Sequence, residues 1–240
     1  MPRYNTAGMG QSGTGTLFVV GTPIGNLADI SFRAVETLKQ VALIAAEDTR
    51  RTRILLNHYG IRTPLTSYNS YNRKTRGREL VRRLEAGDNL ALVSDAGTPG
   101  ISDPLIHLVN EALAVEAPVV SIPGASALIS AVVVSGIPAR RILFEGFLPR
   151  KKGRKKTLEY LAAQPCCVVL FESPNRIMKT LRDIREVFGN RRAAIARELT
   201  KLHEEVLRGT LDDLLADQGE RNWKGEITLV VAGQDSMKGE

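Results

Sequence analysis

The chain has 240 residues, 43% of them hydrophobic, so it can bury a substantial core as one large domain or two smaller ones. It carries 33 Lys and Arg against 26 Asp and Glu, and the resulting net charge of +7 points to a polyanionic partner. No apolar stretch reaches the roughly eighteen residues that a bilayer span requires, which argues against a membrane protein.

Short apolar runs alternate with helical patterns in the first half, which is typical of parallel βαβ units. The first fifteen residues are polar and glycine-rich, and we expect a disordered tail there. The apolar runs then predict strands at 17–21, 42–47, 64–68, 89–95 and 118–124. The helical patterns predict helices at 31–41, 49–60, 78–87 and 105–116, two of them stopped by Gly60 and Gly87.

The second half repeats this kind of alternation after a boundary near Ile122–Gly124. Strands are predicted at 141–149, 166–173, 192–200, 204–210 and 225–233, and helices at 125–136, 154–164 and 175–189. Thr210 and Asp213 form a capping box for one more short helix. The sequence therefore predicts two α/β domains, 16–122 and 123–240, after the tail at 1–15.

Two loops rich in glycine and proline follow predicted strands. "VVGTPIGNLAD" (19–29) matches neither the dinucleotide fingerprint nor a phosphate loop, and a tight strand–helix turn is the simpler interpretation. "SDAGTPGISDP" (94–104) also lacks the lysine of a phosphate loop. Because it follows the carboxyl end of a predicted parallel strand, Gly97, Thr98 and Pro99 favour main-chain binding of a neutral or zwitterionic ligand, and the missing lysine argues against a triphosphate.

Polar residues follow three predicted strands, where a shared cleft or simply solvated strand ends would explain them. The residues are Glu47, Asp48 and Arg50; Glu172, Ser173 and Arg176; and Arg197, Glu198, Thr200, Lys201 and Glu204. The chain has no zinc or iron–sulfur spacing, so metal chemistry is not expected. The two cysteines, Cys166 and Cys167, are adjacent in an apolar run, which favours packing in a cytosolic protein.

Basic residues cluster at 48–53, 72–79 and 149–156. The third cluster has six cations between Arg150 and Lys156, interrupted only by Gly153. Each run alone fits a solvated surface, whereas three runs in one chain favour a nucleic-acid surface as well. Both interpretations stay open, because aromatic residues are too few to argue for base stacking.

Eight segments in this order resemble one known group of proteins. They are "LFVVGTPIGNLADIS", "LIAAEDTRRT", "LVSDAGTPGISDP", "SIPGASA", "FEGFLPRKKGRK", "FESPNRI", "ARELTKLHEEV" and "KGEITLVV". The series resembles the tetrapyrrole-methylase superfamily of S-adenosylmethionine-dependent methyltransferases, and within it the ribosomal RNA small-subunit methyltransferase I branch. The resemblance covers residues 17–231.

This resemblance implies two α/β domains, with the cofactor S-adenosylmethionine held between them, and a homodimer in the cytoplasm. It implies methylation of a cytidine ribose 2′-hydroxyl in the decoding region of 16S ribosomal RNA in the small ribosomal subunit. The implied cofactor-binding residues are Gly97, Thr98, Pro99, Ile101, Ser102, Ser126, Ala127, Phe171, Leu199 and Thr228. The basic residues expected to bind RNA are Arg51, Arg53, Arg150, Lys151, Lys152, Arg154, Lys155 and Lys156.

Transfer to a hydroxyl requires an oxygen in line with the methyl group, helped by a base or a cation. Asp48 is the candidate base, with a helix cap as its alternative role, and Arg50 and Lys201 are candidate phosphate or oxyanion contacts. Two other functions stay open: a tetrapyrrole (porphyrinogen) C-methyltransferase of the same fold, and a non-catalytic RNA-binding assembly factor.

Overall fold

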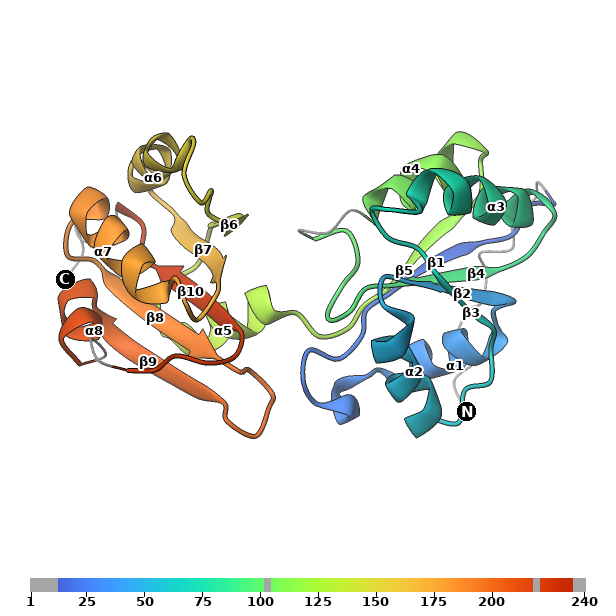
Figure 1. Cartoon of the computed structure of the whole chain (residues 1–240), viewed down its shortest axis with the longest axis horizontal. Helices are drawn as coiled ribbons and strands as arrows, with labels where there is room; N and C mark the ends of the chain where they lie inside the picture. The colour runs from blue at the N-terminus through green and yellow to red at the C-terminus, as the bar shows by residue number, and fades with distance from the viewer. Residues whose placement is uncertain (1–12, 102–104, 218–220, 235–240) are drawn as a thin grey trace. The chain divides into compact units, whose positions relative to one another are not determined.

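The computed structural model describes residues 13–101, 105–217 and 221–234, and these divide into two compact units at Ser126/Ala127 (Figure 1). The boundary expected at 122/123 lies a few residues before this division. Each unit is a sheet of five strands with helices packed on it, so the prediction of two α/β domains is confirmed. No helix within the described ranges is long and apolar enough to cross a membrane.

The first unit is built on a parallel sheet whose strands lie in the order β3-β2-β4-β1-β5. Its strands are β1 (Leu17–Val20), β2 (Leu43–Ala46), β3 (Leu65–Ser67), β4 (Leu90–Val93) and β5 (Val119–Ile122). Its helices are η1 (Leu27–Asp29), α1 (Phe32–Gln40), α2 (Thr49–His58), α3 (Arg73–Glu85) and α4 (Ile106–Ala114). The strand positions expected from the apolar runs agree with these bounds to within a few residues.

Both faces of this sheet are covered, which explains why its strands are apolar at nearly every position. Alternate residues of β2 enter opposite cores: Leu43 and Ala45 pack with α3 and α4, whereas Ile44 and Ala46 pack with α1 and α2. In Figure 1 the two helix pairs lie on opposite sides of the sheet. The helix after β1 therefore covers one face and the helix after β4 covers the other.

The structure extends one helix beyond its expected start. α3 begins at Arg73 rather than at residue 78 and ends before Gly87, which has the left-handed φ of +92°. Its first turn, "RKTRG", contains no apolar residue, so hydrophobic periodicity could not reveal it. The helix start predicted at Asp103–Pro104 lies outside the described residues.

The second unit has a mixed sheet in the order β6-β7-β10-β8-β9. Its strands are β6 (Ile142–Phe147), β7 (Cys167–Glu172), β8 (Arg192–Arg197), β9 (Glu205–Thr210) and β10 (Ile227–Val231), and only the β6–β7 pair is parallel. The helices are α5 (Ala127–Ser135), α6 (Arg154–Ala162), α7 (Ile177–Phe188) and α8 (Leu211–Asp217). Helices α6, α7 and α8 share one core with the sheet, and α5 packs against β10 and β8.

The capping box predicted for α8 is confirmed. The Thr210 hydroxyl accepts a hydrogen bond from the Asp213 main-chain N–H at 3.2 Å, and Asp213 Oδ2 accepts one from the Thr210 main-chain N–H at 2.8 Å. These bonds satisfy N–H groups that a helix start leaves without partners inside the helix.

Candidate functional site

Strands β1 and β4 are neighbours in the first sheet, but their following helices cover opposite faces. Open α/β sheets bind their ligands at such a position, outside the carboxyl ends of the two strands. The loops that leave β1 and β4 are the two glycine- and proline-rich segments of the sequence. The topology therefore marks this edge as the candidate site.

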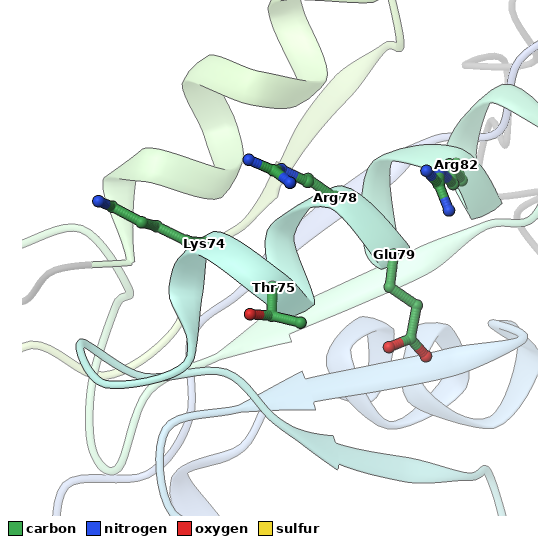
Figure 2. A pocket seen from close by; sticks show the side chains of 5 residues that line it. All are labelled: Lys74, Thr75, Arg78, Glu79 and Arg82. Carbon is green, nitrogen blue, oxygen red and sulfur yellow. The ribbon is translucent and has the colours of Figure 1, made fainter.

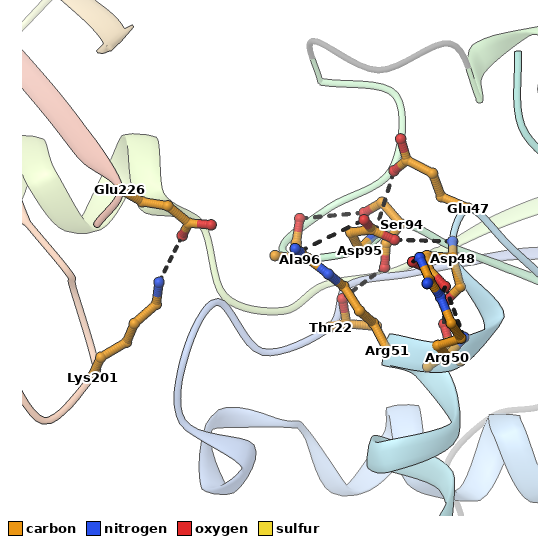
Figure 3. Close-up of polar contacts among 11 residues, drawn as sticks. Thr22, Glu47, Asp48, Arg50, Arg51, Ser94, Asp95, Ala96, Lys201 and Glu226 are labelled. Atoms are coloured by element: carbon orange, nitrogen blue, oxygen red, sulfur yellow. Dashed lines mark hydrogen bonds and ion pairs between the residues drawn. The ribbon is translucent and has the colours of Figure 1, made fainter. Parts of the chain in front are cut away.

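The two loops are joined by a single antiparallel bridge between Thr22 and Gly97. The Thr22 N–H donates to the Gly97 carbonyl at 2.9 Å, and the Gly97 N–H donates to the Thr22 carbonyl at 3.1 Å. The Thr22 hydroxyl lies within hydrogen-bond distance of the carbonyls of Ser94 and Gly97, as Figure 3 shows in part. The bridge holds both loops in one defined arrangement.

The loop after β4 has a backbone that only glycine adopts readily. Gly97 has a φ of +76° and Gly100 a φ of +90°. Within the described ranges, the main-chain N–H groups of Thr98 and Ile101 donate no hydrogen bond, whereas that of Gly97 is used in the bridge. The loop thus offers main-chain donors for a ligand, and Ser102, expected beside them, lies outside the described residues.

A second pair of glycines brings the loops after β1 and β5 into backbone contact. A Cβ atom on Gly21 would lie 2.7 Å from the Gly124 nitrogen, and one on Gly124 would lie 2.7 Å from the Gly21 oxygen. Both distances are too short for real atoms, and backbone cannot move away as a side chain can. Gly21, Thr22 and Gly124 were not among the site residues predicted from the sequence. The Gly-Thr-Pro repeated in the loops after β1 and β4 was a visible signal for Gly21 and Thr22.

Asp48 follows β2 at the same edge of the sheet and caps α2. Its Oδ1 accepts a hydrogen bond from the Arg50 N–H at 2.8 Å, and its two oxygens accept from the Arg50 guanidinium at 3.1 and 2.7 Å (Figure 3). These bonds lower the pKa of Asp48 to about 2. The helix-cap alternative is confirmed, and a carboxylate of such low pKa is a weak proton acceptor.

Asp95 ties the loop after β4 to the start of α2. Its Oδ1 accepts a hydrogen bond from the Asp48 main-chain N–H at 3.0 Å, and its Oδ2 lies 3.7 Å from the guanidinium of Arg51. Arg50 and Arg53 are exposed on the same helix, and 88% of the Arg50 side chain is accessible. The edge therefore presents Arg50 and Arg51, whose guanidinium groups pair with Asp48 and Asp95.

In the second unit, two of the expected cofactor-binding residues are direct neighbours. Thr228 of β10 pairs with Phe171 of β7, and Thr228 is buried. The Phe171 ring makes an edge contact with Phe144, with centroids 4.9 Å apart. Leu199 is also buried and lies just after the end of β8. Ser126 and Ala127 stand at the division between the two units.

Lys201 is held in an ion cluster of the second unit. Its Nζ lies 2.8 Å from Glu198 Oε1 and 2.9 Å from Glu226 Oε2. Burial alone would lower the pKa of Lys201, yet the hydrogen bonds to the two carboxylates raise it above its ordinary value. Glu198 and Thr200 have left-handed φ values of +51° and +66°, which are strained for side chains with a Cβ. Lys201 therefore stabilises a strained loop and is less available for a phosphate than the sequence suggested.

The basic run at 150–156 divides into exposed and buried cations. Arg150, Lys151, Lys152, Lys155 and Lys156 are exposed, as the sequence predicted. Arg154 is only 8% exposed, and its guanidinium donates to Asp183, Thr180 and the Pro149 carbonyl. The expectation that Arg154 contacts RNA is therefore corrected, because its guanidinium group forms its hydrogen bonds inside the second unit.

The described part of the chain contains no group of three or more His, Cys, Asp or Glu side chains that could hold a metal ion. The loops at the carboxyl edge of the first sheet provide main-chain donors, fixed glycine turns and exposed arginines instead. Main-chain donors can hold the polar groups of a small ligand, and exposed arginines can contact the phosphates of a polyanion.

Comparison with known proteins agrees with this arrangement. The model of the family described as Tetrapyrrole (Corrin/Porphyrin) Methylases matches residues 16–215. A protein of Thermotoga maritima named ribosomal RNA small subunit methyltransferase I is 50% identical over 221 residues, which cover 92% of this chain and 100% of that protein. A protein of the same name from Bacillus subtilis is 44% identical, over 95% of this chain and 78% of its own length.

Solved structures show the same fold at low sequence identity. A cobalt precorrin-4 methyltransferase superposes with a TM-score of 0.66 at 15% identity, covering 90% of this chain and 94% of its own. A uroporphyrin-III C-methyltransferase from Thermus thermophilus gives 0.62 at 16% identity, covering 93% and 97%. The fold, the bridged loops and the extent of these matches lead to one conclusion: the chain belongs to the tetrapyrrole (corrin/porphyrin) methylase family.

Proposed function

We propose that this chain is an S-adenosylmethionine-dependent methyltransferase acting on the ribose 2′-hydroxyl of a cytidine in the decoding region of 16S ribosomal RNA. The observation that carries the proposal is the relative named ribosomal RNA small subunit methyltransferase I, which is 50% identical and is covered over its whole length. The exposed cations near the candidate site fit a polyanionic substrate. A porphyrinogen substrate also carries carboxylates, but it does not need so long a cationic strip as the run at 150–156.

The loops at the carboxyl edge fit the cofactor by their chemistry. S-adenosylmethionine has no phosphate, which agrees with a loop that offers the main-chain donors of Thr98 and Ile101 and no lysine. Gly97 and Pro99 keep these donors in place. When bound, S-adenosylmethionine supplies an electrophilic methyl group. In the proposal Ser126, Ala127, Phe171, Leu199 and Thr228 complete its binding site.

Asp48 and Arg50 act on the substrate side of this edge. Asp48 holds the Arg50 guanidinium through two hydrogen bonds, so Arg50 can meet a phosphate or a developing oxyanion without losing its orientation. The low pKa of Asp48 assigns it to positioning Arg50 rather than to removing the hydroxyl proton. Lys201 supports the loop after β8 through its two carboxylate partners.

The exposed cations of both units contribute to RNA binding in this proposal. They are Arg51, Arg53, Arg150, Lys151, Lys152, Lys155 and Lys156. We further propose that the protein acts as a cytoplasmic homodimer on the small ribosomal subunit, and sedimentation of the purified chain tests the dimer. A monomer at all protein concentrations would refute that part.

Methyl transfer from labelled cofactor to isolated small subunits, compared with bare 16S RNA, tests the proposed function. The methylated nucleotide should resist alkaline cleavage, because a 2′-O-methyl group removes the hydroxyl that attacks the neighbouring phosphate. Label in a base instead of a ribose would contradict the proposed target atom. Calorimetry with S-adenosylmethionine tests the alternative of a non-catalytic RNA-binding assembly factor, since such a factor has no use for a cofactor site.

A matched pair of variants connects activity with the loop after β4. Gly97→Val places a β-branched side chain at a φ of +76°, so cofactor binding and methyl transfer should both be lost. Gly60→Val introduces the same strain at a φ of +62°, at the end of α2 and with open space around it. That control should bind the cofactor normally.

A further inference from the structure

Tyr71 presents an aromatic ring to solvent. The residue is 98% exposed, although a tyrosine ring gains free energy from burial. The turn that carries it is well fixed: the Tyr71 N–H donates to Asn69 Oδ1 at 3.1 Å, and Asn72 Nδ2 donates to the Ser67 carbonyl at 3.1 Å. The ring therefore stands on an ordered support and is free to accept a stacking partner.

The place of Tyr71 in the fold links it to the candidate site. The turn follows β3, as the Asp48 cap follows β2 and the Gly97 loop follows β4. All three strands are parallel, so these segments lie at one edge of the same sheet. A nucleic acid whose reacting nucleotide lies at that edge has further nucleotides within reach of Tyr71.

Helix α3 continues from this turn with a row of three exposed cations. Lys74, Arg78 and Arg82 are four residues apart, which places them on one helix face at intervals of about 6 Å. They line a surface pocket together with Thr75 and Glu79 (Figure 2). We call Lys74, Arg78 and Arg82 the α3 stripe. Because α3 leaves the carboxyl edge of the sheet, the stripe leads away from Tyr71.

The cations of the α3 stripe differ from the other arginines of the helix. Arg76 pairs with Glu79 at 2.6 Å, and Arg83 pairs with Asp88 at 2.7 Å. Arg73 Nη1 lies 2.7 Å from His107 Nε2 of α4. In the described ranges the side chains of the α3 stripe make no hydrogen bond or ion pair, so their charges are available to another molecule.

We infer that Tyr71 and the α3 stripe form a binding surface for single-stranded RNA. Tyr71 stacks on a base, and the α3 stripe neutralises the phosphates that follow it. Both contacts tolerate any sequence, because every base has a stacking face and every nucleotide has a phosphate. The inference rests on the proposed function and adds the surface that holds RNA flanking the methylated nucleotide.

Binding of labelled single-stranded RNA to the full chain tests the α3 stripe. Each phosphate contact contributes about 0.7 to the slope of log affinity against log salt for single strands. The variant Lys74→Ala/Arg78→Ala/Arg82→Ala should therefore lower that slope by about two. The control Arg33→Ala/Lys39→Ala/Arg182→Ala removes the same charge from exposed positions on α1 and α7.

Tyr71 has a different signature in the same assay. Tyr71→Ala should weaken binding by roughly 5- to 150-fold, the range that corresponds to loss of one base–aromatic stack. The salt slope should stay unchanged, because no charge is lost. Tyr71→Phe keeps the stacking face and should retain nearly full affinity.

The outcomes separate this inference from the proposed function. If the unaltered chain methylates small subunits while the α3 stripe and Tyr71 variants keep its salt slope and affinity, the surface is refuted and the function stands. An equal loss in the control triple would also refute it, since binding would then follow net charge alone. If the unaltered chain binds RNA but transfers no methyl group, the proposed function fails and the surface stands. Tighter binding of duplex RNA than of single strands would contradict the stacking role.

Discussion

Arg154→Ala is predicted to destabilise the second unit, although the residue lies in a basic run that resembles a surface loop. Arg154 Nε donates to Asp183 Oδ2 at 2.8 Å, and Nη2 donates to the Thr180 hydroxyl at 2.8 Å. The Thr180 hydroxyl in turn donates to the buried Glu172 Oε2 at 2.6 Å. The substitution removes the centre of this network.

The expected cost is about 3 kcal/mol. Removing one partner of a buried pair costs roughly 3–5 kcal/mol, because the other charge stays buried alone. The Asp183 side chain is 23% exposed and keeps the Lys179 ammonium at 3.1 Å, which places the cost at the lower end. Since domains are stable by only about 5–15 kcal/mol, the loss is a large part of the total. Arg154→Lys keeps the charge but not the fork of donors, and should cost about half as much.

Urea unfolding followed by tryptophan fluorescence measures this loss. Trp223 is the chain's one tryptophan and is buried in the core of the second unit, so its signal reports on that unit. Lys155→Ala is the matched control, because its side chain is 87% exposed and its pair with Glu159 is long, at 3.9 Å. Exposed pairs of this kind contribute about 0.3–0.5 kcal/mol. A loss for Arg154→Ala no larger than that of the control would refute the structural role of Arg154.

Three other predictions follow from local geometry. Gly21→Ala should lower stability by about 1–3 kcal/mol and weaken cofactor binding, because its Cβ would lie 2.7 Å from Gly124 nitrogen; unchanged thermal unfolding would contradict the close contact. Asp48 has a pKa of about 2, so it stays ionised above roughly pH 3. Asp48→Asn should lower the methyl-transfer rate, because Arg50 loses its orientation. It should not remove an acid limb of the pH profile, that is, a fall of the rate as the pH is lowered from about 7 to about 5. An acid limb that disappears in this variant would restore Asp48 as the general base. Burial raises the pKa of the Cys167 thiol to about 11, so it should resist alkylation near pH 8 in the folded chain and react in urea, as mass spectrometry can show.

Local sequence patterns were sufficient for most elements of the fold. Apolar runs located the strands, and a polar residue or a glycine marked the start or end of a helix where a cap needs one, as Ser31 and Gly60 illustrate. The start of α3 could not be found in this way, because its first turn contains no apolar residue. Apolar periodicity reports only the residues that face a core.

Side-chain environment depends on the tertiary structure in a different way. The run Arg150–Lys156 reads as six equivalent cations, yet Arg154 alone turns inward, because α6 begins there and carries it towards Asp183 of α7. Lys201 likewise meets Glu226, which is far from it in the sequence. No local pattern contains these partners.

The sequence by itself determined the two α/β domains, the order of their elements and the family, since these depend on hydrophobic spacing, turn residues and motif order along the chain. The tertiary structure alone decided which groups are available for chemistry. It bridges Thr22 to Gly97, joins Asp48 to Arg50, and leaves Tyr71 exposed beside the α3 stripe. The physical reason is that availability and pKa are set by neighbours in space, and folding brings together residues that are distant in the chain.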